Sequence, residues 1–216
     1  MVEIALTGLI SFGILLLSEV LWRKRIMRGE YSRKFVHIGA GLFTASWAWF
    51  LSWRQIVVLA AAGGLVLLTS RLLRIFHGIN DVKRKSYGDV FSSCGIMIAA
   101  AIAKDNKWLF ACSVLMMVLA DGLAAVIGTK YGMKTKYKVF GFTKTLVGTA
   151  TFVAVASLVC VSYVLAVKAP GSSVVTSLMV VGIAAGLAAS ENALPYGLDN
   201  VALPAACALL LGTLFR

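Results

Sequence analysis

Charged residues are scarce in this chain of 216 residues. Asp, Glu, Lys and Arg make up 14% of it, whereas 60% of the residues are hydrophobic. A soluble globular domain has about 25% charged residues and buries most of its apolar side chains in one core. Here apolar runs recur along the whole length, so the sequence predicts a polytopic helical membrane protein.

Motifs for covalent cross-links and common metal sites are also missing. Cys94, Cys112, Cys160 and Cys207 each lie alone in an apolar run, and no CxxC pair occurs. We interpret them as small hydrophobic residues rather than as disulfide partners or metal ligands. His77 lies in a basic segment, where we expect solvated surface. No GxxxxGK[ST] segment occurs, which excludes a Walker A loop.

Acidic residues are the scarcest charged class, with nine Asp and Glu against 21 Lys and Arg and a net charge of +12. Such a balance can indicate nucleic-acid binding, but that function needs a solvated basic face. Here the basic residues lie in short segments between apolar runs, where membrane topology explains them. We therefore expect membrane lipids, and no nucleic acid, as partners.

The expected fold class is an all-α transmembrane bundle of about eight spans, forming a single domain over residues 1–216. The expected spans cover residues 4–22, 36–53, 55–70, 89–103, 108–127, 146–167, 174–189 and 201–215. Several are shorter than the ~20 residues that cross a hydrocarbon core of about 30 Å. Seven or nine spans are therefore also compatible with the sequence.

The basic residues are divided unequally between the two sides of this bundle. The connections after the first, third and fifth spans hold 16 of the 21 Lys and Arg residues. By the positive-inside rule these connections are cytoplasmic and the N-terminus lies outside. Glu3 stands where a signal peptide would carry basic residues, so we expect a retained first span.

Asp121 ends an apolar run that begins at Trp108. A carboxylate within a membrane segment is costly and indicates a functional site. At 1.5 Å per residue, we expect it roughly 10 Å below the cytoplasmic end of its helix, near Gly128. Glu191 and Asp199 fall in the seventh connection, on the same side, and the positive-inside rule does not account for acids there.

Glycines that permit close backbone approach and lysines that can bind phosphate follow Asp121 along the chain. They are Gly128, Lys130, Gly132, Lys144, Thr145 and Gly148, the last three at the expected start of the sixth span. Acids for Mg²⁺, lysines for phosphates and glycines for close approach are what phosphoryl or nucleotidyl transfer requires. Taken alone, Gly128 and Gly132 are better explained by helix packing.

Two further groups of residues have a structural and a functional interpretation. Arg33 and His37 would share a helix face, with Lys34 beside them, which is also typical of a helix that enters the membrane with snorkelling basic residues. Asp89 would open the fourth span, where an acid also stabilises the helix dipole.

The motifs occur in a fixed order along the chain. They are Arg33-Lys34-x-x-His37, Arg84-Lys85-Ser86-Tyr87-Gly88-Asp89, Asp121-Gly122-x-Ala124-x-x-x-Gly128-x-x-x-Gly132, Lys144-Thr145-x-x-Gly148 and Glu191…Asp199-Asn200. Over about residues 30 to 204, this series resembles the dolichol kinase, phytol kinase and CTP-dependent diacylglycerol kinase family. One departure is Leu198, since related sequences often have a second acid directly before the position of Asp199.

The resemblance implies transfer of the γ-phosphate of a nucleotide, usually CTP, to the hydroxyl of a lipid alcohol at the cytoplasmic face. Asp121 would hold Mg²⁺, with Glu191 or Asp199 completing the metal site. The triphosphate would contact one group of residues: Lys144, Thr145, Lys130, Gly128, Gly132, Gly148 and Asn200. Arg33 and Lys34 would neutralise the transferring phosphoryl group. His37 or Asp89 would accept the hydroxyl proton.

Other interpretations remain open at this point. A phosphatidate cytidylyltransferase has a comparable Asp-x-x-Ala…Gly segment, although it lacks the Arg-Lys-x-x-His helix. A membrane carrier could use Asp121, Glu191 and His37 as a relay, and a structural subunit would leave the acids unexplained. The acceptor among polyprenol, phytol, shorter prenols and diacylglycerol, and the oligomeric state, do not follow from the sequence.

Overall fold

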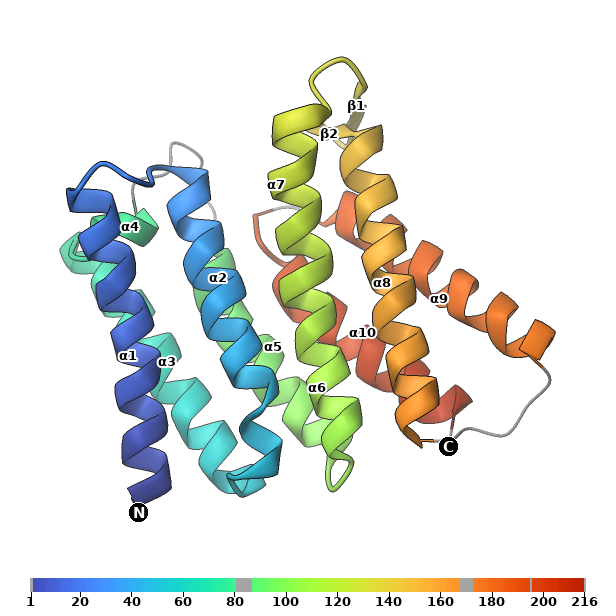
Figure 1. Ribbon diagram of the computed structural model, residues 1–216, viewed down its shortest axis with the longest axis horizontal. Coiled ribbons are helices and arrows are strands. Elements are labelled where there is room, and N and C mark those ends of the chain that lie inside the picture. Colours follow the sequence, from blue (N-terminus) through green and yellow to red (C-terminus); the bar gives the residue numbers. More distant parts are fainter. Residues whose placement is uncertain (1, 81–86, 168–172, 195, 216) are drawn as a thin grey trace.

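The computed structural model describes residues 2–80, 87–167, 173–194 and 196–215, and these are almost entirely helical (Figure 1). The long helices are α1 (Val2–Arg23), α2 (Glu30–Ala45), α3 (Trp53–Leu73), α5 (Gly88–Ala103), α6 (Lys107–Leu115), α7 (Gly122–Tyr131), α8 (Leu146–Val167), α9 (Ser173–Ala193) and α10 (Asp199–Leu214). The short elements are η1 (Trp47–Trp49), α4 (His77–Asn80), η2 (Met116–Asp121) and the strands β1 (Lys136–Val139) and β2 (Phe142–Thr145). Arg84, Lys85 and Ser86 of the second motif lie outside the described residues.

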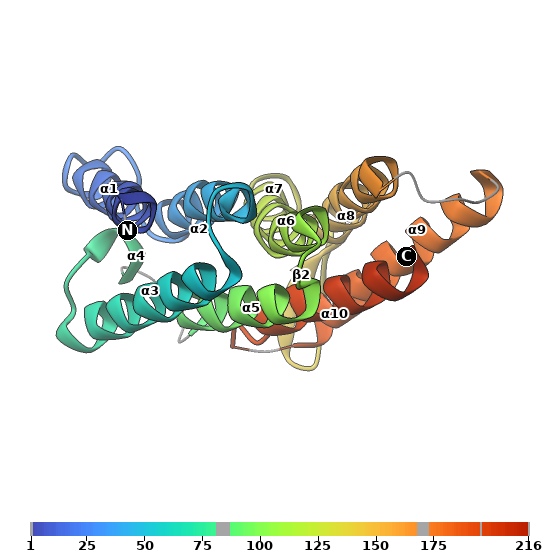
Figure 2. The same cartoon turned by 90° about the horizontal axis from the view of Figure 1, so that it is seen from below.

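The helices form two layers, which are seen end-on in Figure 2. One layer contains α1, α2, the continuous helix α6–η2–α7, and α8. The other contains α3, α5 and α10, with α5 packed between α3 and α10. Helix α9 packs against both α8 and α10, and thereby joins the two layers at one edge.

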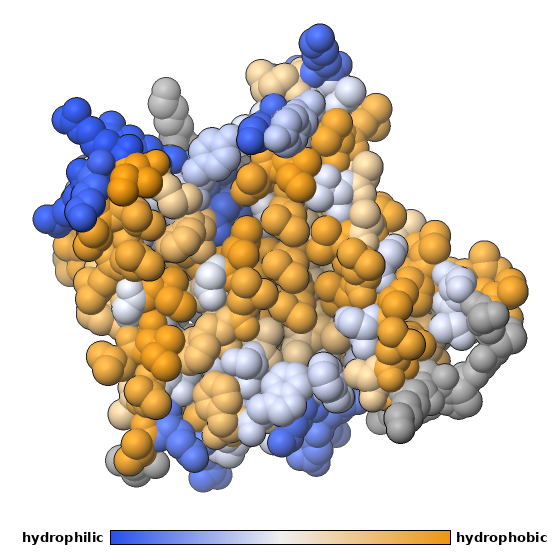
Figure 3. Space-filling model, viewed as in Figure 1, coloured by the Kyte–Doolittle hydropathy of each residue, from blue (hydrophilic) through white to orange (hydrophobic). Residues whose placement is uncertain are grey.

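Apolar side chains cover much of the outer surface. Five helices are long and apolar enough to cross a membrane: Val2–Arg23, Trp53–Leu73, Lys107–Tyr131, Leu146–Val167 and Val174–Ala193. Helices α5 and α10 are shorter but also apolar. Leu9, Leu65, Leu158 and Leu178 are each about two-thirds exposed, and Figure 3 shows an apolar band between two hydrophilic ends. Because water does not tolerate so large an apolar surface, these features indicate a membrane protein.

Seven of the eight expected spans agree with helices to within four residues at each end. The span expected at 36–53 was wrong, since α2 begins six residues earlier, at Glu30, and ends at Ala45. The chain then turns through η1, and Ser52 and Gln55 form a capping box that starts α3. The Ser-x-x-Gln spacing is a local helix-start signal that apolar content alone overlooks.

The β-hairpin is an addition to the expected all-α class. Its strands pair antiparallel from Lys136↔Thr145 to Val139↔Phe142. Phe140 and Gly141 connect them with φ angles of 47° and 85°, which is the backbone of a tight two-residue hairpin turn. Lys144 and Thr145 therefore lie in β2 rather than in the sixth span. Thr145 still caps α8, because its Oγ1 accepts the N–H of Gly148 at 3.0 Å.

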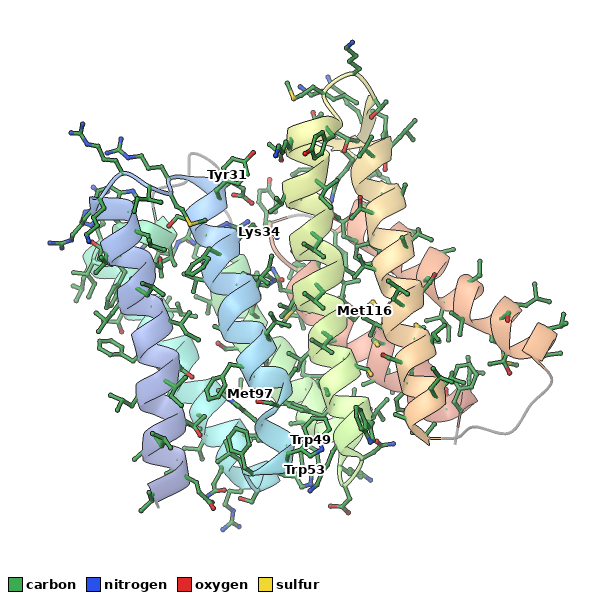
Figure 4. All side chains as sticks on the ribbon, viewed as in Figure 1. Tyr31, Lys34, Trp49, Trp53, Met97 and Met116 are labelled. Carbon is green, nitrogen blue, oxygen red and sulfur yellow. The ribbon has the colours of Figure 1, made fainter. Side chains whose placement is uncertain are left out.

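Tryptophans gather at the end of the bundle opposite the hairpin. Trp49 and Trp53 are labelled there in Figure 4, and the Trp49 ring meets Trp108 edge-to-face at 5.1 Å. Trp53 Nε1 donates to Asp105 at 3.2 Å. Tryptophan is enriched where a membrane meets water, because its ring is apolar and its N–H is polar. The pattern places a membrane boundary at this end.

All four cysteines are free; Cys112, Cys160 and Cys207 are buried and Cys94 is partly buried, as small hydrophobic residues of a helical bundle would be. His77 is not simply solvated. Its side chain is 52% exposed, but its ring stacks on Trp22 at 4.8 Å and its Nδ1 lies 3.4 Å from Glu19. These contacts fasten α4 to the end of α1.

Candidate active site

A cavity of about 1090 Å³ lies at the end of the bundle that carries the hairpin. Its walls come from the start of α2, from η2 and α7, from the hairpin, from the start of α8 and from the α9–α10 connection. Three stretches that are distant in the chain, within residues 28–34, 121–149 and 191–200, thus enclose one space. The sequence predicted that these segments share one side of the membrane, and the fold does bring them together.

Three carboxylates meet in the wall of this cavity. Each of the three residues Asp121, Glu191 and Asp199 offers one carboxylate oxygen, and these three oxygens lie within 4.8 Å of one another. Asp121 and Glu191 are only 6% and 7% exposed. Like charges so close together in a region with little water repel strongly, so the site requires cations beside them.

Two lysines supply positive charge to these acids. Lys34 Nζ donates a hydrogen bond to Asp121 Oδ2, and Lys144 Nζ donates to Glu191 Oε1 and, at 3.2 Å, to the Glu191 backbone carbonyl. Lys34 is 3% exposed and is labelled in Figure 4 on the part of α2 nearest the cavity end. Asp199 Oδ1 accepts the backbone N–H of Asn200 at 3.1 Å.

Arg33, His37 and Asp89 form a second polar group next to these acids. Arg33 donates to Glu30 at 2.5 and 3.2 Å and lies 3.4 Å from Asp89. His37 Nε2 lies 3.4 Å from the Met117 carbonyl and 3.9 Å from Asp121 Oδ2. Arg33 lines the cavity, whereas His37 and Asp89 are not among the described residues that line it. The buried His37 side chain thus lies beside Asp121, and the Asp89 side chain lies beside Arg33.

The backbone at Asp121 departs from α-helical geometry. Met116–Asp121 form a π-helical turn within the continuous helix Lys107–Tyr131. Such turns are rare, widen the helix locally and are frequent at functional sites. Gly41 of α2 has no space for a Cβ, because Val118 of this turn fills the position. The close approach brings α2, with Lys34, against Asp121.

Asp121 is deeper than expected, because the helix continues beyond Gly128. Helix α7 extends ten residues past it, to Tyr131, which is about 15 Å at 1.5 Å per residue. The acid cluster consequently lies well inside the bundle.

A comparison with known proteins agrees with the motif series. A phytol kinase of Synechocystis sp. is 32% identical to this chain over 203 residues, which are 92% of this chain and 85% of the relative. The chain belongs to the phytol/polyprenol kinase family. The family resemblance inferred from the motifs is thereby confirmed, and it identifies this membrane protein as a lipid-alcohol kinase. No family model matches the chain, and no solved structure matches it.

The glycines of the kinase motifs lie where α7 meets the start of α8. A Cβ on Gly128 would be 2.7 Å from Thr145 Oγ1 and 3.0 Å from Gly148 Cα, and one on Gly132 would be 2.6 Å from Thr145 Cβ. The glycines thus permit helix contact, and Gly128 and Gly148 line the cavity as well. Lys130 is exposed, and its ammonium lies 5.1 Å from the centre of the Tyr131 ring. Lys130 is not among the described residues that line the cavity.

Sequence reasoning missed the contacts that hold the hairpin of this kinase in place. The Tyr137 hydroxyl lies 2.5 Å from Thr149 Oγ1 and donates to Asn192 Oδ1 at 3.2 Å. Asn192 and Thr149 both line the cavity. The available signal was the Phe140-Gly141 dipeptide between two short alternating segments, which is typical of a hairpin with a glycine in its turn.

Proposed function

We propose that this lipid-alcohol kinase transfers the γ-phosphate of CTP to the hydroxyl of phytol, a polyprenol or a related isoprenoid alcohol at the cytoplasmic face of the membrane. The observation that carries the proposal is the cavity in which Asp121, Glu191 and Asp199 meet Lys34 and Lys144. Membership of the kinase family supports this activity over cytidylyl transfer and over a carrier. CTP as the donor rests on the family resemblance.

The three carboxylates fit the requirements of Mg²⁺. This ion prefers oxygen ligands and is usually held by one or two carboxylates together with substrate phosphates. Asp121, Glu191 and Asp199 offer oxygens within 4.8 Å of one another, so they are the residues that would hold it. Bound there, Mg²⁺ would neutralise charge on the phosphate oxygens.

The basic residues of the site would bind the triphosphate. Lys34 and Lys144 each donate to a carboxylate, and each can exchange that oxygen for a phosphate oxygen of the nucleotide. Arg33 also lines the cavity, and its planar guanidinium is held by Glu30 and Asp89. Fixed positive charges of this kind stabilise the transferring phosphoryl group, which is the main requirement of phosphoryl transfer.

The candidate bases receive a different role. His37 lies beside Asp121, and Asp89 lies beside Arg33, so we propose that they position these residues. The alcohol oxygen attacks the γ-phosphorus, the bond to the β-phosphate oxygen breaks and releases CDP, and the hydroxyl proton passes to Asp199 in the cavity wall. A loose transition state makes little demand on a strong base.

The acceptor would enter from the bilayer, with its chain between apolar helices and its hydroxyl at the depth of Asp121. A transfer assay on the purified protein in lipid vesicles with Mg²⁺ tests the proposal. γ-Labelled CTP and γ-labelled ATP are each tested with phytol, farnesol, a long polyprenol and diacylglycerol as acceptors. Label in an isoprenoid alcohol, absent with Asp121→Asn, is the expected result. Label in no lipid, from folded wild-type protein, would contradict the proposal.

A further inference from the structure

The hairpin presents two chemically different faces. Side chains alternate along a strand, so Tyr137, Val139, Phe142 and Lys144 share one face, given the register of the pairs. On this face Tyr137 bonds Asn192, Lys144 bonds Glu191, and Phe142 contacts Tyr196. One face of the hairpin thus follows the end of α9 and the connection to α10.

Phe142 and Tyr196 form an aromatic pair in the cavity wall. Their ring centroids are 5.8 Å apart with an interplanar angle of 88°, and both residues line the cavity. In an edge-to-face pair, each ring covers at most one face of the other. Tyr196 is 61% exposed, so it retains an open ring face on which a planar group can stack.

The backbone holds Tyr196 in an unusual conformation. Its φ is 57° and that of Gly197 is 94°, and the first value is rare for a residue with a side chain. The Tyr196 carbonyl accepts the N–H of Tyr87 at 3.1 Å, which ties the connection to the start of α5. Strained positions that the surrounding structure fixes are concentrated at ligand-binding sites.

We propose that Phe142 and Tyr196 form the binding site for the nucleobase of the phosphoryl donor. The inference rests on the proposed function and adds the part of the cavity that recognises the base. Phe142 is two residues from Lys144 on the same strand face, or about 7 Å at 3.4 Å per residue. That separation suits a base on the aromatic pair and phosphates at Lys144, with the ribose between them.

The surroundings favour a nucleobase over the lipid chain. Phe142 belongs to the hairpin, and the end of the bundle that carries the hairpin is hydrophilic in Figure 3. Lys136 and Thr143, which also line the cavity there, are exposed. An isoprenoid chain would have to leave the bilayer to reach this position, whereas a nucleotide would reach it directly from water.

The test compares ligands with and without a base. Affinities of CTP, ATP and inorganic tripolyphosphate are measured with Mg²⁺ and no alcohol, on wild-type protein, Tyr196→Leu and Tyr196→Phe. Since stacking on one aromatic ring contributes a factor of roughly ten, Tyr196→Leu should weaken binding of the preferred nucleotide about tenfold. Its affinity for tripolyphosphate should not change, and Tyr196→Phe, which keeps the ring, should resemble wild type. Phe140→Leu, at an 80% exposed position of the hairpin turn, is the matched control.

Equal losses for nucleotide and tripolyphosphate would overturn the inference, as would unchanged nucleotide binding by Tyr196→Leu. A higher KM for the alcohol with unchanged nucleotide affinity would assign the rings to the lipid chain instead. Transfer activity of the wild type is measured in parallel. An inactive wild type contradicts the proposed function, whereas an active wild type with unaffected Tyr196→Leu contradicts the base site alone.

Discussion

Asp121, Glu191 and Asp199 concentrate negative charge within a small part of the cavity wall. Two like charges about 4 Å apart repel by about 4 kcal/mol at an effective dielectric constant of about 20. Lys34 and Lys144 offset this repulsion by direct hydrogen bonds. The same lysines are the groups that would bind phosphate, so stability and nucleotide binding depend on one set of charges.

Asp121→Asn should lower transfer at least a hundredfold, because Mg²⁺ and Lys34 both lose a charged partner. The variant should also be less stable, since an unpaired buried ammonium costs about 3–5 kcal/mol. Lys34→Met combined with Asp121→Asn should recover much of the thermal stability without recovering transfer. Rates and melting temperatures in detergent check this. Wild-type transfer by Asp121→Asn would remove Asp121 from the site.

Lys144→Gln should raise the KM for the nucleotide about tenfold or more, because a charge-assisted bond to phosphate is lost. The KM for the alcohol should stay constant. Lys138→Gln is the control, since Lys138 is exposed on the other face of the same hairpin. Steady-state kinetics with each substrate varied in turn measure both constants, and equal behaviour of the two variants would refute the role of Lys144.

At the scale of elements, the contact between α7 and α8 fixes the hairpin that joins them. Gly128 and Gly148 allow these helices to approach, and Tyr137 then ties the hairpin to Thr149 of α8 and Asn192 of α9. Lys144 lies on the strand that this arrangement holds against Glu191. The packing of two helices thus determines where Lys144, the lysine proposed to bind phosphate, lies.

Gly128→Ala should destabilise the protein by about 1–3 kcal/mol, because the added methyl would overlap Thr145 and the Gly148 backbone. Gly182→Ala is the matched control on α9, where an added Cβ has no neighbour within 4 Å. That variant should be neutral or slightly more stable, since alanine favours helix. Thermal unfolding without ligands distinguishes the two. An unchanged melting temperature of Gly128→Ala would contradict the packing role of Gly128.

The extent to which the sequence predicted the structure differs from one element to the next. Asp121 was recognisable because a carboxylate in an apolar run is costly, and the motif order gave Lys34, Lys144 and Glu191 their place in one site. The π-helical turn that ends at Asp121 has no local sequence pattern, and its close contact with Gly41 joins residues distant in the chain. Tyr196 resembled an ordinary connection residue, because its position beside Phe142 exists only once the hairpin has docked.

At the scale of the whole molecule, the cavity end and the tryptophan end are opposite faces of one apolar bundle. Figure 1 shows the hairpin and the α1–α2 connection at one end, and both chain ends at the other. The positive-inside rule assigns the hairpin end to the cytoplasm. Eight spans and an outside N-terminus remain predictions.

Single cysteines introduced at two lysines test this orientation. Lys138→Cys, in the hairpin, should react with a membrane-impermeant thiol reagent only in inside-out vesicles. Lys107→Cys, at the opposite end, should react only in right-side-out vesicles. Both substitutions are made in a Cys94→Ser background, because Cys94 is partly exposed whereas Cys112, Cys160 and Cys207 are buried, and that background protein is the blank. Labelling of both variants from one side would contradict a site that faces the cytoplasm.

The proposed function requires that the protein transfers the terminal phosphate of CTP to a lipid alcohol. The most direct test incubates wild-type protein in vesicles containing phytol with either α-labelled or γ-labelled CTP, and then extracts the lipid. The account predicts label in the lipid from γ-labelled CTP alone, with CDP as the second product. Label in the lipid from α-labelled CTP, or from neither nucleotide, would contradict it.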